Sequence, residues 1–138
     1  MPSPSLSLSG PWTGVYDYNN SAQEAVSFTA DLTDIAGAVW GDIEEPNSIS
    51  PTAAKVLAAS VSGMRSGYEV TFEKTYIGEV PGGEFPVFYA GTMSRNGQRI
   101  SGTWKIRGPW PASGPFVMNR IKGQAVSRVL SLVTEAER

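Results

Sequence analysis

Two cations stand in strand-like stretches whose neighbouring positions on the same face are apolar or aromatic. Lys74 lies between Phe72 and Tyr76 at a spacing of two residues, and Arg120 follows Met118 at the same spacing. Because residues two apart in a strand point to the same face, both cations are predicted on the inner face of a sheet. A buried cation needs a carboxylate, a carbonyl or a ligand anion. These positions therefore predict a cationic mouth that receives a carboxylate or a phosphate.

Two alternatives stay open for these cations. Both side chains could lie near a strand end and reach solvent along their methylene stems. Lys74 could instead form a buried structural pair with a carboxylate, and its replacement would then leave that carboxylate unpaired. The sequence alone does not decide among a ligand contact, a structural pair and a solvated cation.

Aromatic residues accompany the cations on the predicted inner faces. Side chains with a large apolar body and one polar atom line many ligand cavities, but they also fill barrels that have no cavity. Both interpretations stay open for the inner aromatic set, which is Trp12, Tyr16, Tyr18, Tyr76, Tyr89 and Trp104. The predicted ligand-binding residues are Trp12, Tyr16, Lys74, Tyr76, Tyr89, Trp104 and Arg120.

The chain contains no cysteine and no histidine. This composition excludes disulfides and thiol nucleophiles, and it removes the commonest general base and metal ligand. The acidic run Asp42, Glu44 and Glu45 precedes a proline without a calcium-loop pattern, so we interpret it as a solvated loop. Glu69 or Glu73 with Tyr76 could act as acid and base in a barrel cyclase or isomerase, but both glutamates alternate outward. We therefore expect no enzyme activity, no metal and no cofactor.

Alternating patterns predict the strands that must position these residues. An apolar residue, any residue and then glycine recur at residues 12–14, 35–37, 61–63, 89–91 and 100–102. In a strand this phrase places a bulky group beside a missing side chain, as the inner face of a small, sharply curved barrel requires. The strands are predicted at residues 11–18, 25–32, 35–43, 56–63, 68–76, 86–94, 99–107 and 114–121, with a tight turn at residues 33–34. We expect an all-β fold, an eight-stranded antiparallel up-and-down barrel.

Two segments are harder to assign. Residues 51–59 could form a helix capped by Ser50, but we favour a strand at residues 56–63 because barrel closure needs it. Beyond Lys122 the apolar residues fall at a spacing of three and four, which predicts a short C-terminal α-helix at about residues 124–137. Its apolar stripe would pack on its own barrel wall or form a homodimer contact, and Trp40 and Trp110 would also suit an interface.

Length and charge indicate a single domain. We interpret residues 1–9 of the 138-residue chain as a flexible tail and residues 10–138 as one barrel domain with its helix. The net charge of −2 without a basic run argues against a nucleic-acid partner. No apolar run is long enough for a membrane helix and no signal peptide is recognisable, so we expect a cytoplasmic protein without a membrane partner.

Short motifs on the first and seventh predicted strands carry a family resemblance. The motifs are Gly-Pro-Trp at residues 10–12 and Gly-Thr-Trp at residues 102–104. Together with the strand rhythm over residues 10–121, they resemble the calycin barrels, namely the lipocalins, the fatty-acid-binding proteins and, in length, avidin and streptavidin. The resemblance implies a barrel with a ligand pocket at one mouth, and we carry over this fold class without the ligand.

Two functions remain as expectations. The first is a non-enzymatic barrel that binds a small, partly apolar molecule, with an anionic group as one option. The second is a protein-interaction or assembly module whose barrel is filled by side chains.

Overall fold

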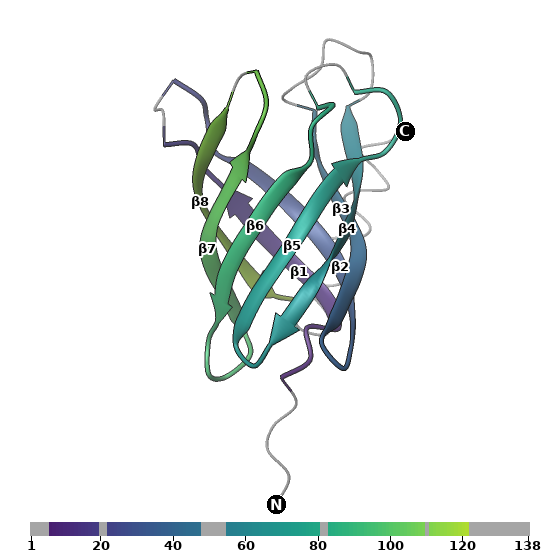
Figure 1. Cartoon of the computed structure of the whole chain (residues 1–138), viewed down its shortest axis with the longest axis vertical. Helices are drawn as coiled ribbons and strands as arrows, with labels where there is room; N and C mark the ends of the chain where they lie inside the picture. The colour runs from purple at the N-terminus through teal and green to yellow at the C-terminus, as the bar shows by residue number, and fades with distance from the viewer. Residues whose placement is uncertain (1–5, 20–21, 48–54, 81–82, 110, 122–138) are drawn as a thin grey trace, which may run out of the picture.

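Eight antiparallel strands, each paired with its neighbours in the sequence, close into a barrel in which β8 pairs back with β1 (Figure 1). The computed structural model describes residues 6–19, 22–47, 55–80, 83–109 and 111–121. The strands are β1 (Gly10–Tyr16), β2 (Val26–Ile35), β3 (Ala38–Pro46), β4 (Val56–Ser66), β5 (Glu69–Tyr76), β6 (Val87–Met93), β7 (Arg99–Ile106) and β8 (Ala112–Arg120). The predicted eight-stranded up-and-down barrel is confirmed.

The ambiguous segment in the middle of the chain is a strand. β4 pairs with β3 on one side and with β5 on the other, and its inner positions include Leu57, Ala59 and Val61. The predicted C-terminal helix with its homodimer contact, and Trp110, lie outside the described residues. Within the described ranges, no helix has the length and apolar character needed to cross a membrane.

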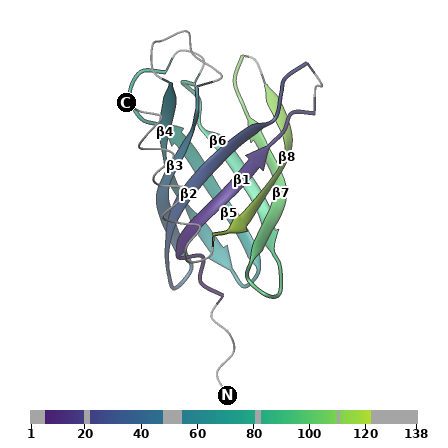
Figure 2. The ribbon, with the colours of Figure 1, turned by 180° about the vertical axis from the view of Figure 1, so that it is seen from behind.

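The two ends of the barrel differ. β2, β4 and β6 lead into the next strand through turns at residues 36–37, 67–68 and 94–98, and we call this the hairpin end. β1, β3, β5 and β7 finish at the opposite end, which we call the loop end. Figure 2 shows β1 between β2 and β8, and the chain enters β1 at the hairpin end.

The turn between β2 and β3 lies three residues later than predicted. Ile35 pairs with Ala38, so the turn consists of Ala36 and Gly37, whose φ angles are 53° and 91°. Two consecutive positive φ angles suit the right-handed twist of the flanking strands, and glycine adopts them at little cost. The phrase at residues 35–37 therefore forms a turn, which corrects its assignment to the barrel interior.

Glycines at the waist of the barrel lie where neighbouring strands come too close for a side chain. The inner glycines of β1, β4 and β7 each lie directly opposite a phenylalanine on the neighbouring strand. A Cβ atom on any of these glycines would collide with backbone or side-chain atoms of the neighbouring strand. The pairs are Gly14 with Phe28, Gly63 with Phe72 and Gly102 with Phe116. The three phenylalanines are each 3% exposed, so side chains fill the middle of the barrel.

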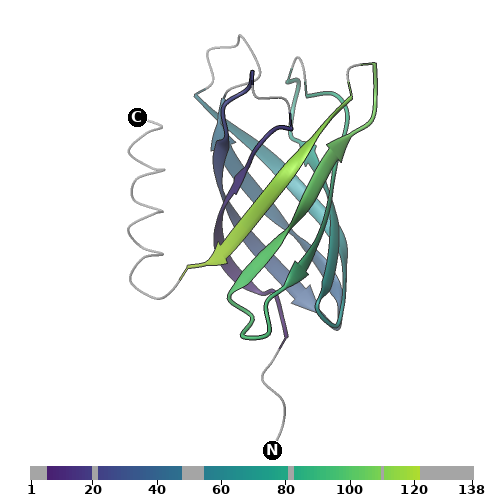
Figure 3. The same cartoon turned by 90° about the vertical axis from the view of Figure 1, so that its left-hand side faces the viewer.

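Residues 6–9, at the end of the stretch interpreted as a flexible tail, pack across the hairpin end. The Leu8 side chain is fully buried, and its N–H donates to Oδ2 of Asp34 at 2.9 Å. Nε1 of Trp12 donates to the Leu8 carbonyl oxygen, also at 2.9 Å. β8 slopes down the wall to this end (Figure 3), where Arg120 pairs in register with Trp12. The segment is held because its backbone groups find partners inside the barrel.

Candidate functional site

A buried ion pair lies inside the loop half of the barrel. Nζ of Lys74 on β5 lies 2.7 Å from Oε1 of Glu45 on β3, and the two side chains are 2% and 0% exposed. Strand alternation points both inward, because Glu45 follows the buried Ile43 and Lys74 follows the buried Phe72. The alternative of a lysine that reaches solvent is therefore wrong.

Two tyrosine hydroxyls complete the surroundings of the Glu45 carboxylate. The Tyr16 hydroxyl donates to Oε2 at 2.6 Å, and the Tyr76 hydroxyl lies 3.1 Å from both oxygens. With Lys74, three side chains from β1 and β5 direct hydrogens at one carboxylate. Such hydrogen bonds are what allow a charge to remain ionised away from water.

The Lys74 ammonium is surrounded by aromatic faces. Its Nζ lies 4.7 Å from the ring centroid of Tyr16, 4.7 Å from that of Tyr76 and 5.7 Å from that of Tyr89. The negative face of an aromatic ring attracts a cation most strongly where water is excluded. The three rings therefore stabilise a positive charge at this point of the barrel.

Burial shifts the proton equilibria of the cluster. It lowers the pKa of the Lys74 ammonium, although the charge and hydrogen bond of Glu45 oppose this shift. Burial, reinforced by the nearby Glu45 charge, raises the pKa of the Tyr16 and Tyr76 hydroxyls far above the ordinary value. Burial also raises the pKa of Tyr89. At neutral pH the tyrosines are therefore hydrogen-bond donors and not phenolates.

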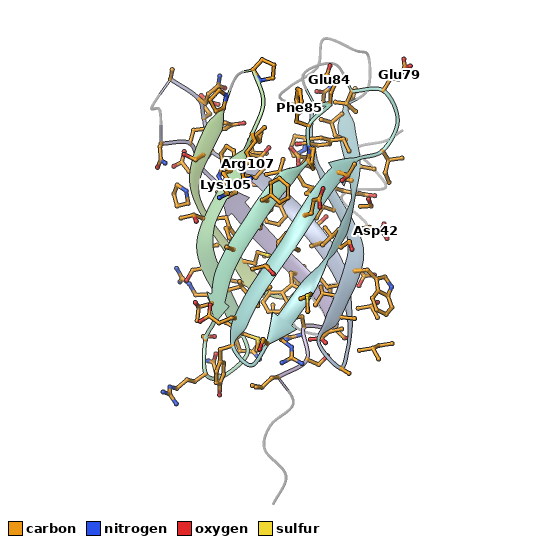
Figure 4. The ribbon with its side chains drawn as sticks, viewed as in Figure 1. Asp42, Glu79, Glu84, Phe85, Lys105 and Arg107 are labelled. Carbon is orange, nitrogen blue, oxygen red and sulfur yellow. The ribbon has the colours of Figure 1, made fainter. Side chains whose placement is uncertain are left out.

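Above the ion pair, a cavity of about 400 Å³ opens toward the loop end. Lys74 is part of its lining, whereas Glu45 is not, so Lys74 is the member of the pair that borders the cavity. Figure 4 shows Glu84 and Phe85 at the loop end, where they contribute to the rim. The full lining is Tyr16, Tyr18, Lys74, Tyr76, Gly83, Glu84, Phe85, Val87, Tyr89, Trp104, Ile106 and Pro109.

Aromatic packing shapes the wall and the floor of the cavity. Trp104 stands edge-on to Tyr18, with ring centroids 5.0 Å apart, and its Nε1 donates to the Asp17 carbonyl oxygen at 2.7 Å. Below them, the Tyr89 ring stacks on Phe72 at 4.7 Å. The Tyr89 hydroxyl is buried, and no described residue supplies it with a hydrogen-bond partner. It is a polar group for which a bound molecule could provide the partner.

The structure brings together five of the seven predicted ligand-binding residues. Tyr16, Lys74, Tyr76, Tyr89 and Trp104 all line the cavity. Their role in binding a ligand stays a prediction.

Trp12 and Arg120 lie at the hairpin end instead. The Arg120 guanidinium stacks on Trp12 at 4.4 Å from a ring centroid and donates to the carbonyl oxygens of Ser7, Ser9 and Gly97. Lys74 and Arg120 therefore do not share one cationic mouth, which corrects that prediction.

Sequence reasoning missed Glu45. The acidic run interpreted as a solvated loop continues β3, with Asp42 exposed on the outer wall (Figure 4) and Glu45 only 2% exposed. The alternation of Val39, Gly41 and Ile43 points Glu45 inward if the strand runs two residues further than predicted. In the described part of the chain, no three carboxylates gather to hold a metal ion.

Comparisons with protein-family models, curated proteins and solved structures gave no match for this chain.

Proposed function

We propose that the barrel binds a small, partly apolar molecule in the cavity at the loop end, without catalysing a reaction. The observation that carries this proposal is an aromatic-walled cavity of about 400 Å³ whose lining includes a single lysine, Lys74, among the described residues. Its volume falls in the range of cavities that take small ligands. The closed barrel is compatible with a calycin-type fold, and the resemblance to avidins and lipocalins, which take ligands at one mouth, supports the same use.

The polar groups of the cavity indicate how such a molecule would lie. An acceptor atom of the ligand would approach Nζ of Lys74, and its apolar body would contact Trp104, Tyr18 and Phe85 near the rim. The Tyr89 hydroxyl offers a second polar contact. Because Glu45 already neutralises Lys74, the cavity does not need a ligand anion, and burying one would add an uncompensated charge. The charge balance favours an uncharged ligand.

A matched pair of fluorescent probes tests the proposal. N-phenylnaphthylamine is uncharged, and anilinonaphthalene sulfonate has the same skeleton with an added sulfonate. We expect both to gain fluorescence in the cavity, and the uncharged probe to bind at least as tightly. Native mass spectrometry of freshly purified protein would also detect a co-purified molecule.

Two tryptophan substitutions provide the control. Ile106→Trp places a larger side chain in the cavity wall and so fills part of the cavity. Ile35→Trp makes the same kind of change at an exposed residue of the hairpin end. Binding that is lost in Ile106→Trp and kept in Ile35→Trp supports the proposal. Binding that is equal in both variants, or absent from the wild-type protein, contradicts it.

The outer wall supports a second candidate function, a protein-interaction module. A shallow groove crosses β4 to β7, and it includes the exposed Met64 and Phe88 together with Glu73 and Lys105. Exposed apolar side chains beside charges of both signs are typical of contact surfaces. Light scattering, which measures molar mass in solution, tests this function on the wild-type protein and on Phe88→Ser. If the groove is a contact surface, the wild-type protein should form an assembly and Phe88→Ser should dissociate it.

A further inference from the structure

The amine in the cavity has the surroundings of a carbonyl-binding lysine. Among the described residues, Lys74 is the one lysine of the cavity lining, and both Lys55 and Lys105 are exposed outside it. Lys74 combines three features: a place in the lining of the cavity, a carboxylate 2.7 Å from its Nζ and three aromatic rings around the charge. Lysine amines in desolvated surroundings form Schiff bases with carbonyl compounds.

We propose that Lys74 binds aldehydes covalently and reversibly, as a protonated Schiff base with Glu45 as its counter-ion. This inference rests on the proposed function, because the aldehyde must first enter the cavity. It narrows the ligand class to small uncharged aldehydes, in particular aryl or conjugated ones that suit the aromatic walls.

The reaction balances with the groups in the cluster. Oε1 of Glu45 takes one proton from the Lys74 ammonium, which leaves a free amine and a neutral carboxyl group. The amine nitrogen forms a bond to the aldehyde carbon, and transfer of a second proton from nitrogen to oxygen gives a carbinolamine. Glu45 then returns its proton to the carbinolamine hydroxyl, the carbon–oxygen bond breaks, and water leaves. The products are an iminium ion on Lys74, a carboxylate on Glu45 and one water molecule.

Charge conservation makes this site better suited to an aldehyde than to an anion. The ammonium and the iminium each carry one positive charge, so the barrel interior keeps a neutral pair before and after the reaction. The Tyr16 and Tyr76 hydroxyls hold the Glu45 carboxylate, and their rings face the cation at 4.7 Å. A delocalised iminium would gain from both contacts.

The proton equilibrium of the lysine supports the same chemistry. Burial lowers the pKa of Lys74, so a larger fraction of this side chain is free amine than at an exposed lysine. Each unit by which the pKa falls raises that fraction about tenfold at neutral pH. The attack on a carbonyl is therefore expected to be faster at Lys74 than at the surface lysines.

Reductive trapping tests the proposal. The protein is incubated with cinnamaldehyde and sodium cyanoborohydride at neutral pH, and the adduct is located by intact mass and peptide mapping. We expect one reduced cinnamyl group on Lys74, formed at least about tenfold faster than on Lys105. Without the reductant, we expect absorbance at longer wavelength than that of free cinnamaldehyde.

Variants assign the roles of the two residues. Lys74→Arg keeps a cation for Glu45 but removes the primary amine, so the fast adduct should disappear. Lys105→Arg, on the outer wall, should leave it unchanged. Glu45→Gln should weaken the long-wavelength absorbance seen without reductant, because the iminium on Lys74 would lose its counter-ion. Peptide mapping of the wild-type protein decides the question even where a variant is unstable.

Cinnamyl alcohol separates this inference from the proposed function. It has nearly the same shape as cinnamaldehyde but no carbonyl group, so it can compete for the cavity without reacting. If it displaces N-phenylnaphthylamine while cinnamaldehyde labels Lys74 no faster than Lys105, the Schiff-base inference is wrong and the binding function stands. If neither compound nor the probe enters the cavity, both proposals are wrong.

Discussion

Nζ of Lys74 and Oε1 of Glu45 lie 2.7 Å apart, although their strands do not pair with each other. β4 separates β3 from β5, and its inner residue Ala59 is in register with Ile43 on one side and Tyr76 on the other. The pair thus bridges three strands across a small side chain. Because both charges are buried, each depends on the other to offset the cost of leaving water.

Removal of one partner of this pair should destabilise the barrel. Lys74→Met would strand the Glu45 carboxylate in the interior and should lower the free energy of unfolding by about 3–5 kcal/mol. The double variant Glu45→Gln with Lys74→Met removes both charges but keeps an amide for the Tyr16 and Tyr76 hydroxyls, so it should recover most of that loss. Chemical denaturation measures the free energy of unfolding of the wild type, the single variant and the double variant.

Lys105→Met on the outer wall is the control for the loss of a lysine, and it should change stability by less than about 0.5 kcal/mol. A Lys74→Met protein as stable as the wild type would contradict the buried pair.

The barrel could be predicted because each strand repeats the same signal. Val70, Phe72, Lys74 and Tyr76 alternate with outward polar residues, and the same period of two recurs in the other strands. Alternation assigns a side chain to a face of the sheet. Most of the cavity lining follows from that assignment.

Alternation does not give the height of a residue along the barrel. Lys74 is near the end of β5 and Arg120 is at the end of β8, and strands of odd and even number finish at opposite ends of an up-and-down barrel. This parity places the two cations apart, and it follows from the strand count alone. The separation of Lys74 and Arg120 could therefore have been predicted from the sequence once eight strands were assigned.

The burial of Glu45 was harder to predict from the local sequence pattern. Two acidic residues before Pro46 resemble a solvated loop, because an unpaired carboxylate is rarely buried. What holds Glu45 inside is a set of donors from β1 and β5, neither of which is adjacent to β3. The residues next to Glu45 in the sequence do not indicate such distant partners.

Alkaline pH should unfold the protein in a way that its tyrosines report. Burial raises the pKa of Tyr16, Tyr76 and Tyr89 in the folded state, so above about pH 10 these groups are ionised only when the chain is unfolded. The unfolded state then binds fewer protons than the folded state, and stability falls as the pH rises. Phenolate absorbance from these residues should therefore appear together with the loss of near-ultraviolet circular dichroism.

The variant Tyr89→Phe removes one of these hydroxyls while keeping the ring. It should lower the phenolate amplitude of the unfolding step and weaken the alkaline destabilisation. The prediction is wrong if phenolate absorbance from the buried tyrosines develops fully before the circular dichroism changes. These hydroxyls would then ionise in the folded protein.

The waist should not tolerate a methyl group at its inner glycines. In Gly102→Ala, the new Cβ would collide with the Ala90 carbonyl oxygen and with Gly91 Cα on β6. Because both are backbone atoms, relief requires strand movement, and we expect a loss of about 2 kcal/mol. Ser101→Ala, the exposed neighbour on the same strand, should cost less than about 0.5 kcal/mol. Equal stability of the two variants in thermal melts would contradict this account of the waist.

Asp34 organises the hairpin end as Glu45 organises the loop half. Its carboxylate accepts hydrogen bonds from Nε of Arg65 and from the N–H groups of Leu8 and Gly37. Burial by itself raises the pKa of this carboxyl, but these hydrogen bonds lower it more, so the pKa lies below its ordinary value. The ionised carboxylate thereby holds the N-terminal segment and the turn at residues 36–37 together.

Acidification should release this contribution. Because the pKa of Asp34 is lower in the folded state than in the unfolded state, its stabilisation is complete above the ordinary carboxyl pKa of about 4 and is lost as the pH falls through the folded value. Asp34→Asn should therefore lower Tm at neutral pH, and its Tm should fall less than that of the wild type between about pH 6 and pH 3. Asp31→Asn, on the exposed face of β2, should behave as the wild type in both respects. If Asp34→Asn loses as much Tm on acidification as the wild type, the carboxylate is not what holds this end of the barrel closed.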